Sequence, residues 1–543
     1  MTSPPQWHPA LAADALPAGG AAPARVQGRQ IALFRLADGS VRACNNRCPH
    51  EGYPLCEGHV DAAGVLTCQW HNWKFDLATG ANLYGGDGLR LYPAEQRGDG
   101  QVWVDVADEP PARLQARALA ALDDAMELDD RPRIARELAR LERDGGSPAQ
   151  AVAHAVLAGH ARLRDGMTHA HAVAECWLRL RDELDDPVQR LACSTEAVGY
   201  LGREAMRQPV VPYSDATSAW DAARFAAAVE AQDEAAALAP LQGALQSGVA
   251  LDALMPTLTQ VALAHYNDFG HTLIYLSHLP GLVARLGTAS LRPLLRAWVR
   301  AAVRCTREDL LPDFKAYAPA LRAWPATPAA HAATAADVQT LAAAFEARSV
   351  RDTLATVVDA AAVQPPDQLR EALLVAGAHH LLRFDEAHAL RTDNPVADNV
   401  GWLDFSHAIT FAHALRRLLP LGSPLWREGL LQMALFLGRN RAYLVPGLDS
   451  AEARRPWAVA DGAAFDAACR AQVLDHGLDP DIFPAHLLKT WLAVRGEIAG
   501  GVAPDTAASM RAALRRLMAA RFKQRHSLRL AHQALALVGR ESG

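Results

Sequence analysis

Hydrophobic residues follow two different periodicities along the chain. Near the N-terminus, short apolar runs such as QIALFRL (residues 30–36) and QVWVDV (101–106) are separated by turns such as ADGS (37–40). Runs of this length, bounded by turn residues, predict the strands of a small β-domain. Farther along, apolar residues recur every three or four positions, as in LRPLLRAWVRAAV (291–303), and this spacing predicts amphipathic helices.

The change between the two patterns falls in ADEPPAR, residues 107–113. After it, alanine, leucine and arginine dominate, and these are strong helix formers. Ser147 and Asp186 each precede a proline and predict helix N-termini. We expect a small all-β domain over residues 1–108, followed by a large all-α domain over residues 109–543 with roughly fifteen or more helices. No heptad or 34-residue repeat favours a solenoid.

Composition narrows the class of protein. A chain of 543 residues is too long for one ordinary core, so two or three domains are expected. A net charge of −6 gives no support for nucleic acid or an anionic membrane as a partner. The N-terminus shows no signal peptide, and no apolar run has transmembrane length. We therefore expect a soluble cytoplasmic protein with reduced thiols, and we leave oligomerisation open.

Two short loops carry metal-ligand residues. Cys48-Pro-His50 is followed, after seventeen residues, by Cys68-Gln-Trp-His71. Two cysteines and two histidines could bind one zinc ion. A Rieske centre needs two thiolates on one iron and two imidazoles on the other iron of a [2Fe–2S] cluster. Each loop would then supply one ligand of each kind, as this spacing allows.

The segments CPHEGYPL, EGHVD and LTCQWHNWKFDLATG resemble the Rieske family, over roughly residues 6–106. The resemblance implies a [2Fe–2S] cluster on the four residues above, reduced by an NAD(P)H-dependent reductase or a ferredoxin. High-potential members carry a further cysteine in each loop, joined as a disulfide, but position 70 is Trp here. Cys44 and Cys56 are therefore expected as free thiols, as in the ferredoxin and oxygenase branch. The potential should lie in the lower part of the Rieske range of about −150 to +300 mV.

The helical region lacks the alternating pattern of the large antiparallel sheet that follows a Rieske domain in ring-hydroxylating oxygenases. Its candidate sites are therefore helices that place ligand-type residues together. Four segments contain such residues: GMTHAHAVAECW (166–177) with His169 and His171, HYNDFGHTLIYLSH (265–278) with Asp268 and His271, LDFSHAITFAHAL (403–415) with Asp404 and His407, and FPAHLLKTW (483–491) with His486 and Lys489. The second and third segments share a D-F-[GS]-H core.

Other readings of these residues stay open. A helical histidine can be a core or capping residue, and Asp268 and Asp404 can be N-caps. The pairs Asp268-x-x-His271 and Asp404-x-x-His407 could instead hold two metals, as E-x-x-H pairs do in di-iron bundles. Lys489 is distinctive because only four of the 54 basic residues are lysines, and it sits in an otherwise apolar helix. A buried lysine can be neutral, nucleophilic or carboxylated, whereas arginine is always charged.

The helical part resembles the questin oxidase-like family. The matching stretches occur in the same order as in that family: THAHAVAE, GHTLIYL, SHAITFAHAL and AHLLKT. Members of this family cleave rings of anthraquinone-type aromatic polyketides with O₂. The resemblance implies a non-haem iron held by histidines and a carboxylated lysine, here His171, His271, His407, His486 and Lys489, with His169 as a replacement for His171. Lys489, Asp268 and Asp404 are the candidate catalytic residues.

Together these features predict a Rieske-fused non-haem iron oxygenase that uses O₂ on an aromatic or polycyclic substrate. The interior of the helical bundle would supply an apolar pocket, with Trp177, Trp402 and Tyr275 as candidates for its lining. The alternative is a non-catalytic electron carrier whose helical part is a docking or oligomerisation module. Iron content separates these hypotheses, because the carrier holds two irons per chain, the oxygenase about three and the di-metal variant four.

Overall fold

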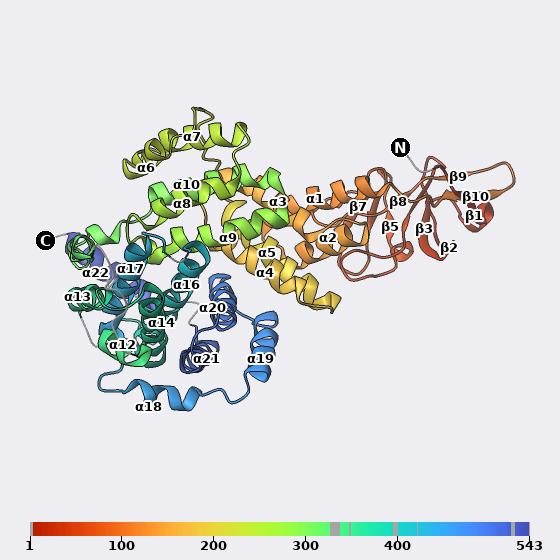
Figure 1. The fold of residues 1–543 in the computed structure, drawn as a ribbon. Helices are drawn as coiled ribbons and strands as arrows, with labels where there is room; N and C mark the ends of the chain where they lie inside the picture. Colours follow the sequence, from red (N-terminus) through yellow and green to blue (C-terminus); the bar gives the residue numbers. More distant parts are fainter. Residues whose placement is uncertain are drawn as a thin grey trace. The chain divides into compact units, whose positions relative to one another are not determined.

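The structure is a computed structural model that describes residues 4–325, 337–346, 349–394, 400–420, 422–522 and 527–541. A small β-domain is followed by a large all-helical region, as the hydrophobic pattern predicts (Figure 1). The chain divides into two compact units, Met1–His154 and Ala155–Gly543.

The β-domain contains three antiparallel sheets, with strand orders β1-β10-β9, β2-β3-β4-β8 and β5-β6-β7. The strands are β1 (Trp7–Ala12), β2 (Ala21–Val26), β3 (Arg29–Arg35), β4 (Val41–Asn45), β5 (His59–Val60), β6 (Val65–Thr67), β7 (Lys74–Asp76), β8 (Leu91–Tyr92), β9 (Ala94–Gln96) and β10 (Gln101–Asp105).

Strand β3 is buried on both faces and separates two small cores. Its side chains alternate, so that Ile31 and Leu33 enter one core while Ala32 and Phe34 enter the other. This is the two-residue period of a strand. The second core also contains the two cysteines of the motif loops, with Leu55, Leu66 and Phe75 packed around them. The apolar run of β3 therefore packs into the same core as the cysteines of the two motif loops.

The first unit is larger than the β-domain. The strands end at Asp105 and helix α1 begins at Pro111, where the sequence predicts the change, but the compact unit continues to His154. Helix α2 is tied to the β-domain by Asp87, which is only 2% exposed. The Asp87 carboxylate accepts hydrogen bonds from the guanidinium groups of Arg136 and Arg140. The first helices thus pack in one compact unit with the β-domain, while the change from strands to helices falls near the expected boundary at residue 108.

Capping residues define the helix ends as expected: Ser147 accepts from the backbone N–H of Gln150 at 3.1 Å, and Asp186 accepts from that of Val188, also at 3.1 Å. The described α-helices are α1 (Pro111–Leu128), α2 (Arg131–Arg143), α3 (Pro148–Gly159), α4 (His169–Asp182), α5 (Pro187–Ala205), α6 (Ala222–Glu230), α7 (Glu234–Gln246), α8 (Leu251–Leu263), α9 (His271–Leu286), α10 (Leu291–Arg304), α11 (Tyr317–Ala323), α12 (Val338–Glu346), α13 (Val350–Ala361), α14 (Pro366–Arg383), α15 (Ala387–Leu390), α16 (Trp402–Leu418), α17 (Trp426–Asn440), α18 (Ser450–Arg454), α19 (Gly462–Leu474), α20 (Ile482–Ala499), α21 (Pro504–Met518) and α22 (Ser527–Glu541).

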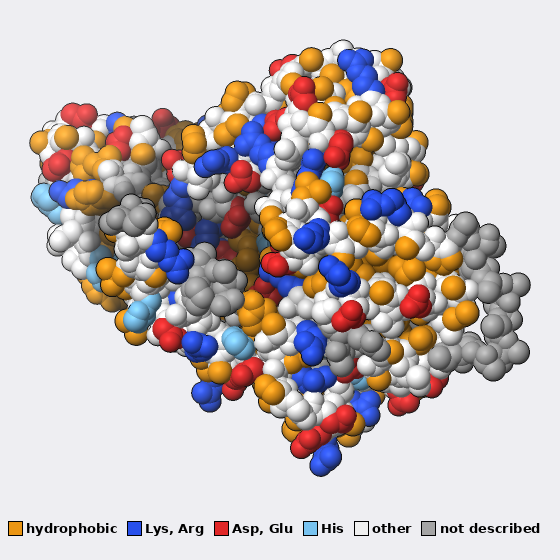
Figure 2. All heavy atoms as spheres, turned by 90° about the vertical axis from the view of Figure 1, so that its left-hand side faces the viewer, with side chains coloured by type: hydrophobic (Ala, Val, Ile, Leu, Met, Phe, Trp, Pro, Cys, Tyr) orange, Lys and Arg blue, Asp and Glu red, His pale blue; other side chains and the backbone are white. Residues whose placement is uncertain are grey.

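Four helices from distant parts of the sequence close a ring in the second unit. Helix α4 packs against α9, α9 against α16, α16 against α20, and α20 against α4 (Figure 1). Figure 2 shows one face of the molecule, on which acidic and basic side chains are interspersed. No helix in the described ranges has the length and apolar character needed to span a membrane.

Candidate functional sites

The two motif loops have the same backbone design. In the first loop the N–H of Cys48 donates to the carbonyl of Tyr53, and in the second loop that of Cys68 donates to Trp73, both at 2.8 Å. The residue four positions after each cysteine, Gly52 or Asn72, has a positive φ (78° and 58°). Glycine and asparagine are the residues that adopt this conformation at the lowest cost. Each turn brings a cysteine and the following histidine to the same end of the domain.

The four donors form two layers. The thiols of Cys48 and Cys68 are buried, with exposures of 4% and 1%, and they lie next to each other. His50 and His71 are exposed, and their Nδ1 atoms are 3.1 Å apart. Trp73 stacks on the His50 ring at 4.6 Å, and Trp70 stacks on His71 at 4.9 Å. Two inner thiolates and two outer imidazoles are the donor set of a Rieske cluster, so these residues fit the group.

The remaining cysteines of the β-domain fit the expectation of free thiols. Cys44 is buried in β4, and the Cys56 sulfur accepts a hydrogen bond from Asn46 Nδ2 at 3.3 Å. All eight cysteines of the chain are free.

In the second unit, each helix of the ring supplies one histidine to a common cluster. His169 and His271 are the first residues of α4 and α9, while His407 and His486 lie within the first two turns of α16 and α20. The Nε2 atoms of His271 and His407 are 2.8 Å apart. Ligand atoms of His169, His407 and His486 all lie within 4.8 Å of one another. Imidazole nitrogens bind zinc and iron at about 2.0–2.1 Å, so one ion can reach several of these atoms.

Hydrogen bonds at the opposite ring nitrogens orient the imidazoles. Nδ1 of His407 lies 2.7 Å from the carbonyl oxygen of Leu403, and Nδ1 of His486 lies 3.0 Å from the hydroxyl of Ser406. Nδ1 of His169 lies 3.1 Å from the hydroxyl of Tyr275, whose ring stacks on His271. Metal-binding histidines commonly have such a partner on the nitrogen that does not bind the metal.

Two of the inward-facing nitrogens have no partner. Nε2 of His169 and Nε2 of His486 are buried and make no hydrogen bond to any described residue. Buried polar atoms without a partner are rare and require an explanation, such as an ion. The donor set therefore fits a metal that favours imidazole, such as iron or zinc.

Burial keeps these histidines neutral. Desolvation, followed by the Lys489 charge, lowers the pKa of His271 to about 3 and that of His486 well below its usual value. For His407 the pKa is also far lowered, by desolvation first and then by His271. Since only a neutral imidazole can bind a metal, the lone pairs are available at neutral pH.

Lys489 lies one turn after His486 and is 2% exposed. Its amine has no hydrogen-bond partner among the described residues. Desolvation lowers its pKa to about 7, partly offset by the nearby Cys176. A large fraction of the amine can therefore be neutral at physiological pH, a form that arginine does not offer.

His171 lies outside the cluster. Its Nδ1 accepts a hydrogen bond from the backbone N–H of Thr168 at 3.4 Å and closes a capping box at the start of α4. Residues two positions apart face different sides of a helix, so the start of α4 brings only one of the two histidines inward. The structure places His169 there, which is the replacement that the sequence left open.

Both candidate aspartates cap backbone groups. Asp404 Oδ2 accepts from the N–H of Gly401 at 2.8 Å, and the Asp268 carboxylate accepts from the N–H of Thr306 at 3.2 Å. Neither carboxylate joins the histidine group, so the pairs expected for a di-metal site are not assembled. Burial raises the pKa of both carboxyls. Of the expected pocket-lining residues, Tyr275 contacts the cluster, Trp402 packs against Phe384, and Trp177 is buried in α4.

The sequence did not point to Phe269 and Arg439. Asp268, Phe269 and Gly270 all have positive φ (35°, 57° and 75°), an unusual run that leads directly into His271. The centre of the Phe269 ring lies 5.3 Å from that of the His407 ring, and the Arg439 guanidinium lies over the Phe269 ring at 3.8 Å. A bulky residue in left-handed conformation is strained, and such strain clusters at functional sites.

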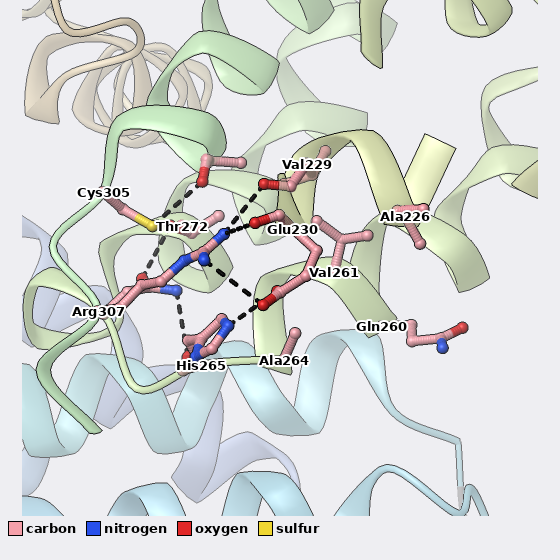
Figure 3. A pocket seen from close by; sticks show the side chains of 13 residues that line it. Ala226, Val229, Glu230, Gln260, Val261, Ala264, His265, Thr272, Cys305 and Arg307 are labelled. Carbon is pink, nitrogen blue, oxygen red and sulfur yellow. Dashed lines mark hydrogen bonds and ion pairs between the residues drawn. The ribbon is translucent and has the colours of Figure 1, made fainter. Parts of the chain in front are cut away.

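A cavity of about 260 Å³ is lined by residues of α6, α8 and α10 and of the segments beside them (Figure 3). Asn267 and Thr272 border it, but none of the four cluster histidines does. Among its lining residues, His265 forms ion pairs with Asp309 at 3.0 Å and Glu230 at 2.9 Å, and these two partners raise the pKa of His265. His265 is therefore held in an ion-pair network, separate from the histidine cluster.

Comparison with known proteins identifies the first site. Residues 6–85 match the Rieske [2Fe-2S] domain family. Oxidoreductase NdmD of Pseudomonas putida is 28% identical over 130 residues, which are 22% of this chain and 21% of NdmD. 4beta-methylsterol monooxygenase of Methylococcus capsulatus is 36% identical over 95 residues, which are 16% of this chain and 25% of that protein. The terminal oxygenase of carbazole 1,9a-dioxygenase from Nocardioides aromaticivorans is 30% identical, with a TM-score of 0.18, over 19% of this chain and 31% of that one.

The N-terminal part of the chain is a Rieske [2Fe–2S] domain, and it has oxygenases and oxidoreductases among its relatives. The chain spans about a fifth to a quarter of the length of these two curated relatives. The resemblance of the helical region to the questin oxidase-like family stays a prediction.

Proposed function

We propose that this chain is a Rieske-fused non-haem iron oxygenase that uses O₂ on an aromatic or polycyclic substrate. The observation that carries the proposal is the convergence of three imidazoles, which a fourth, that of His271, joins through His407, with two buried Nε2 atoms that have no partner within the described ranges. When bound, a Rieske cluster supplies single electrons and a non-haem iron supplies a site for O₂ activation. Fusion of the two domains raises their effective concentration.

In this proposal, His169, His407 and His486 form the core of the iron site, and His271 is the fourth ligand. Lys489 stands beside them as a neutral amine that could take up CO₂ and become an oxygen donor, as the questin oxidase-like resemblance implies. Asp268 and Asp404 hold backbone at the site through Thr306 and Gly401. Their role is therefore positioning rather than direct catalysis.

The surroundings of the cluster suit an apolar, planar substrate. Phe269 and Tyr275 bring aromatic rings against the histidines, at 5.3 Å from His407 and 5.3 Å from His271. Burial of His407 and His486, at 4% and 0% exposure, keeps bulk water from the proposed iron.

An external reductase or ferredoxin would reduce the cluster. His50 and His71 are exposed, and Trp70 beside them is 54% exposed. This edge would bring an electron donor close to the outer iron. The alternative is a non-catalytic electron carrier. The same edge would then exchange electrons, and the helical unit would serve only as a docking or oligomerisation module.

Iron content per chain tests the proposal. After anaerobic reconstitution we expect about three irons in the wild type and about two in His407→Ala, with the Rieske spectrum unchanged. His413→Ala is the matched control, because His413 is also buried on α16 but binds Glu497 at 2.8 Å, outside the cluster. It should keep three irons. Two irons in the wild type would favour the electron carrier, and zinc in the histidine cluster would exclude iron chemistry there.

A further inference from the structure

We infer that Ser406 is a positioning residue of the histidine site, which fixes the proton of His486 so that its Nε2 lone pair faces the metal. This inference rests on the proposed function. Ser406 is fully buried in α16, next to His407. Its hydroxyl lies 2.8 Å from the carbonyl oxygen of Leu403 and 3.0 Å from Nδ1 of His486.

The direction of each hydrogen bond follows from the number of protons. The Leu403 carbonyl can only accept, so Nδ1 of His407 must carry a proton, and its Nε2 must carry the lone pair. The Ser406 hydroxyl has a single proton, which it donates to the same carbonyl. With its proton on that carbonyl, the hydroxyl accepts from His486, whose Nδ1 is then protonated. The opposite arrangement would leave the proton of His486 on Nε2, which is buried and has no acceptor among the described residues.

One backbone carbonyl thus sets the tautomer of two histidines on two helices. It acts on His407 directly and on His486 through Ser406. In the metal-free protein His271 fits the same scheme, because its Nε2 must donate to the lone pair of His407 across 2.8 Å. Without the Ser406 oxygen, Nδ1 of His486 would be buried with no acceptor, and the ring could place its proton on the metal-facing nitrogen instead.

Ser277 provides a matched control. It is buried in α9, and its hydroxyl donates to the carbonyl three residues earlier, Ile274, at 2.7 Å. Ser277→Ala and Ser406→Ala remove the same group from the same kind of helical bond. Only Ser406 also accepts from a cluster histidine.

The first measurement is the Fe²⁺ affinity of the full-length, cluster-loaded chain by anaerobic competition with a chelator. We expect Ser406→Ala to bind about 10–100-fold more weakly, the usual loss when the partner of a metal-binding histidine is removed. Ser277→Ala should stay within about threefold of the wild type. Equal affinity in Ser406→Ala and the wild type, or an equal loss in Ser277→Ala, would overturn the inference.

The second measurement does not depend on iron. Long-range ¹H–¹⁵N spectra of metal-free protein labelled at histidine report which ring nitrogen is protonated. We expect the Nδ1–H form for His486 in the wild type and in Ser277→Ala, and a shift towards the Nε2–H form in Ser406→Ala. An Nε2–H form in the wild type would overturn the inference. If the tautomer behaves as expected but no variant binds Fe²⁺, the proposed function fails while the role of Ser406 in orienting the ring stands.

Discussion

The Rieske site and the histidine cluster of the helical unit differ in how the chain assembles their donors. In the Rieske domain, all four donors lie between Cys48 and His71, on two loops with matching backbone hydrogen bonds. In the helical unit, the donors come from four helices between His169 and His486, each from a separate part of the sequence. The first site is a local structure that rests on a small core, while the second exists only when the helical ring has closed.

The histidines of the two sites also differ in their exposure to solvent. The outer imidazoles of the Rieske site face solvent, where an electron donor can approach. In the helical site, His407 and His486 are buried and kept neutral by desolvation. A site that receives electrons needs an open edge, whereas a site that activates O₂ benefits from the exclusion of water. The contrast predicts that mutations should affect the two sites independently.

The largest expected effect is at Cys48. Cys48→Ser should abolish the visible and EPR signature of the Rieske cluster, because no other side chain can replace the buried thiolate. The iron of the helical site should remain, so iron content should fall from about three to about one per chain. A residual Rieske spectrum would contradict the ligand assignment. Loss of all three irons would show that the sites are not independent.

Lys489→Arg should remove only the iron of the helical site. The buried amine has no partner among the described residues, and a guanidinium cannot become an oxygen donor. Iron content should fall by one per chain while the Rieske spectrum stays intact. Lys315→Arg is the control, since Lys315 is exposed in the same unit, and its free energy of unfolding should change by no more than about 0.5 kcal/mol. Full iron content in Lys489→Arg would exclude this lysine from the site.

Gly270→Ala should weaken the link between α9 and α16. Gly270 has a φ of 75°, and an added Cβ would overlap the ring of Phe411 on the helix that carries His407. We expect a loss of about 2–4 kcal/mol in the free energy of unfolding of the helical unit, measured with denaturant. Gly248→Ala, at a φ of 76° but with open space around the Cβ, should lose only about 1 kcal/mol. Equal losses would show that the Phe411 contact contributes nothing.

The same contrast explains what the sequence could predict. The Rieske loops are contiguous motifs, so their ligands, the free Cys44 and Cys56, and the change to helices near residue 110 could all be read directly. For the helical site, ligand-type residues could be found, but not which of them meet. Whether His169 or His171 points into the cluster depends on how α4 begins, and the cap at Thr168 sets that start.

Other features depended on tertiary contacts that have no local signature. Helical periodicity shows that α2 is a helix, but not that Asp87 ties it to the β-domain. Asp268 and Asp404 have the spacing of metal ligands, and their backbone partners became visible only in the fold. Ser406 is a common residue in a buried helix, and its role follows only from the positions of Leu403 and His486.

The smallest expected effect is at Trp70, which stacks on His71 but is 54% exposed. The position of His71 is set by the backbone of its loop, where Cys68 and Asn72 make the turn. Trp70→Ala should therefore keep the full cluster and change the free energy of unfolding by about 0.5 kcal/mol or less, as is usual for exposed residues. Iron content, the Rieske spectrum and denaturant unfolding measure this. A loss of cluster would mean that the exposed ring, rather than the loop backbone, holds the outer imidazole, and the Rieske site would then depend on side-chain packing as the helical site does.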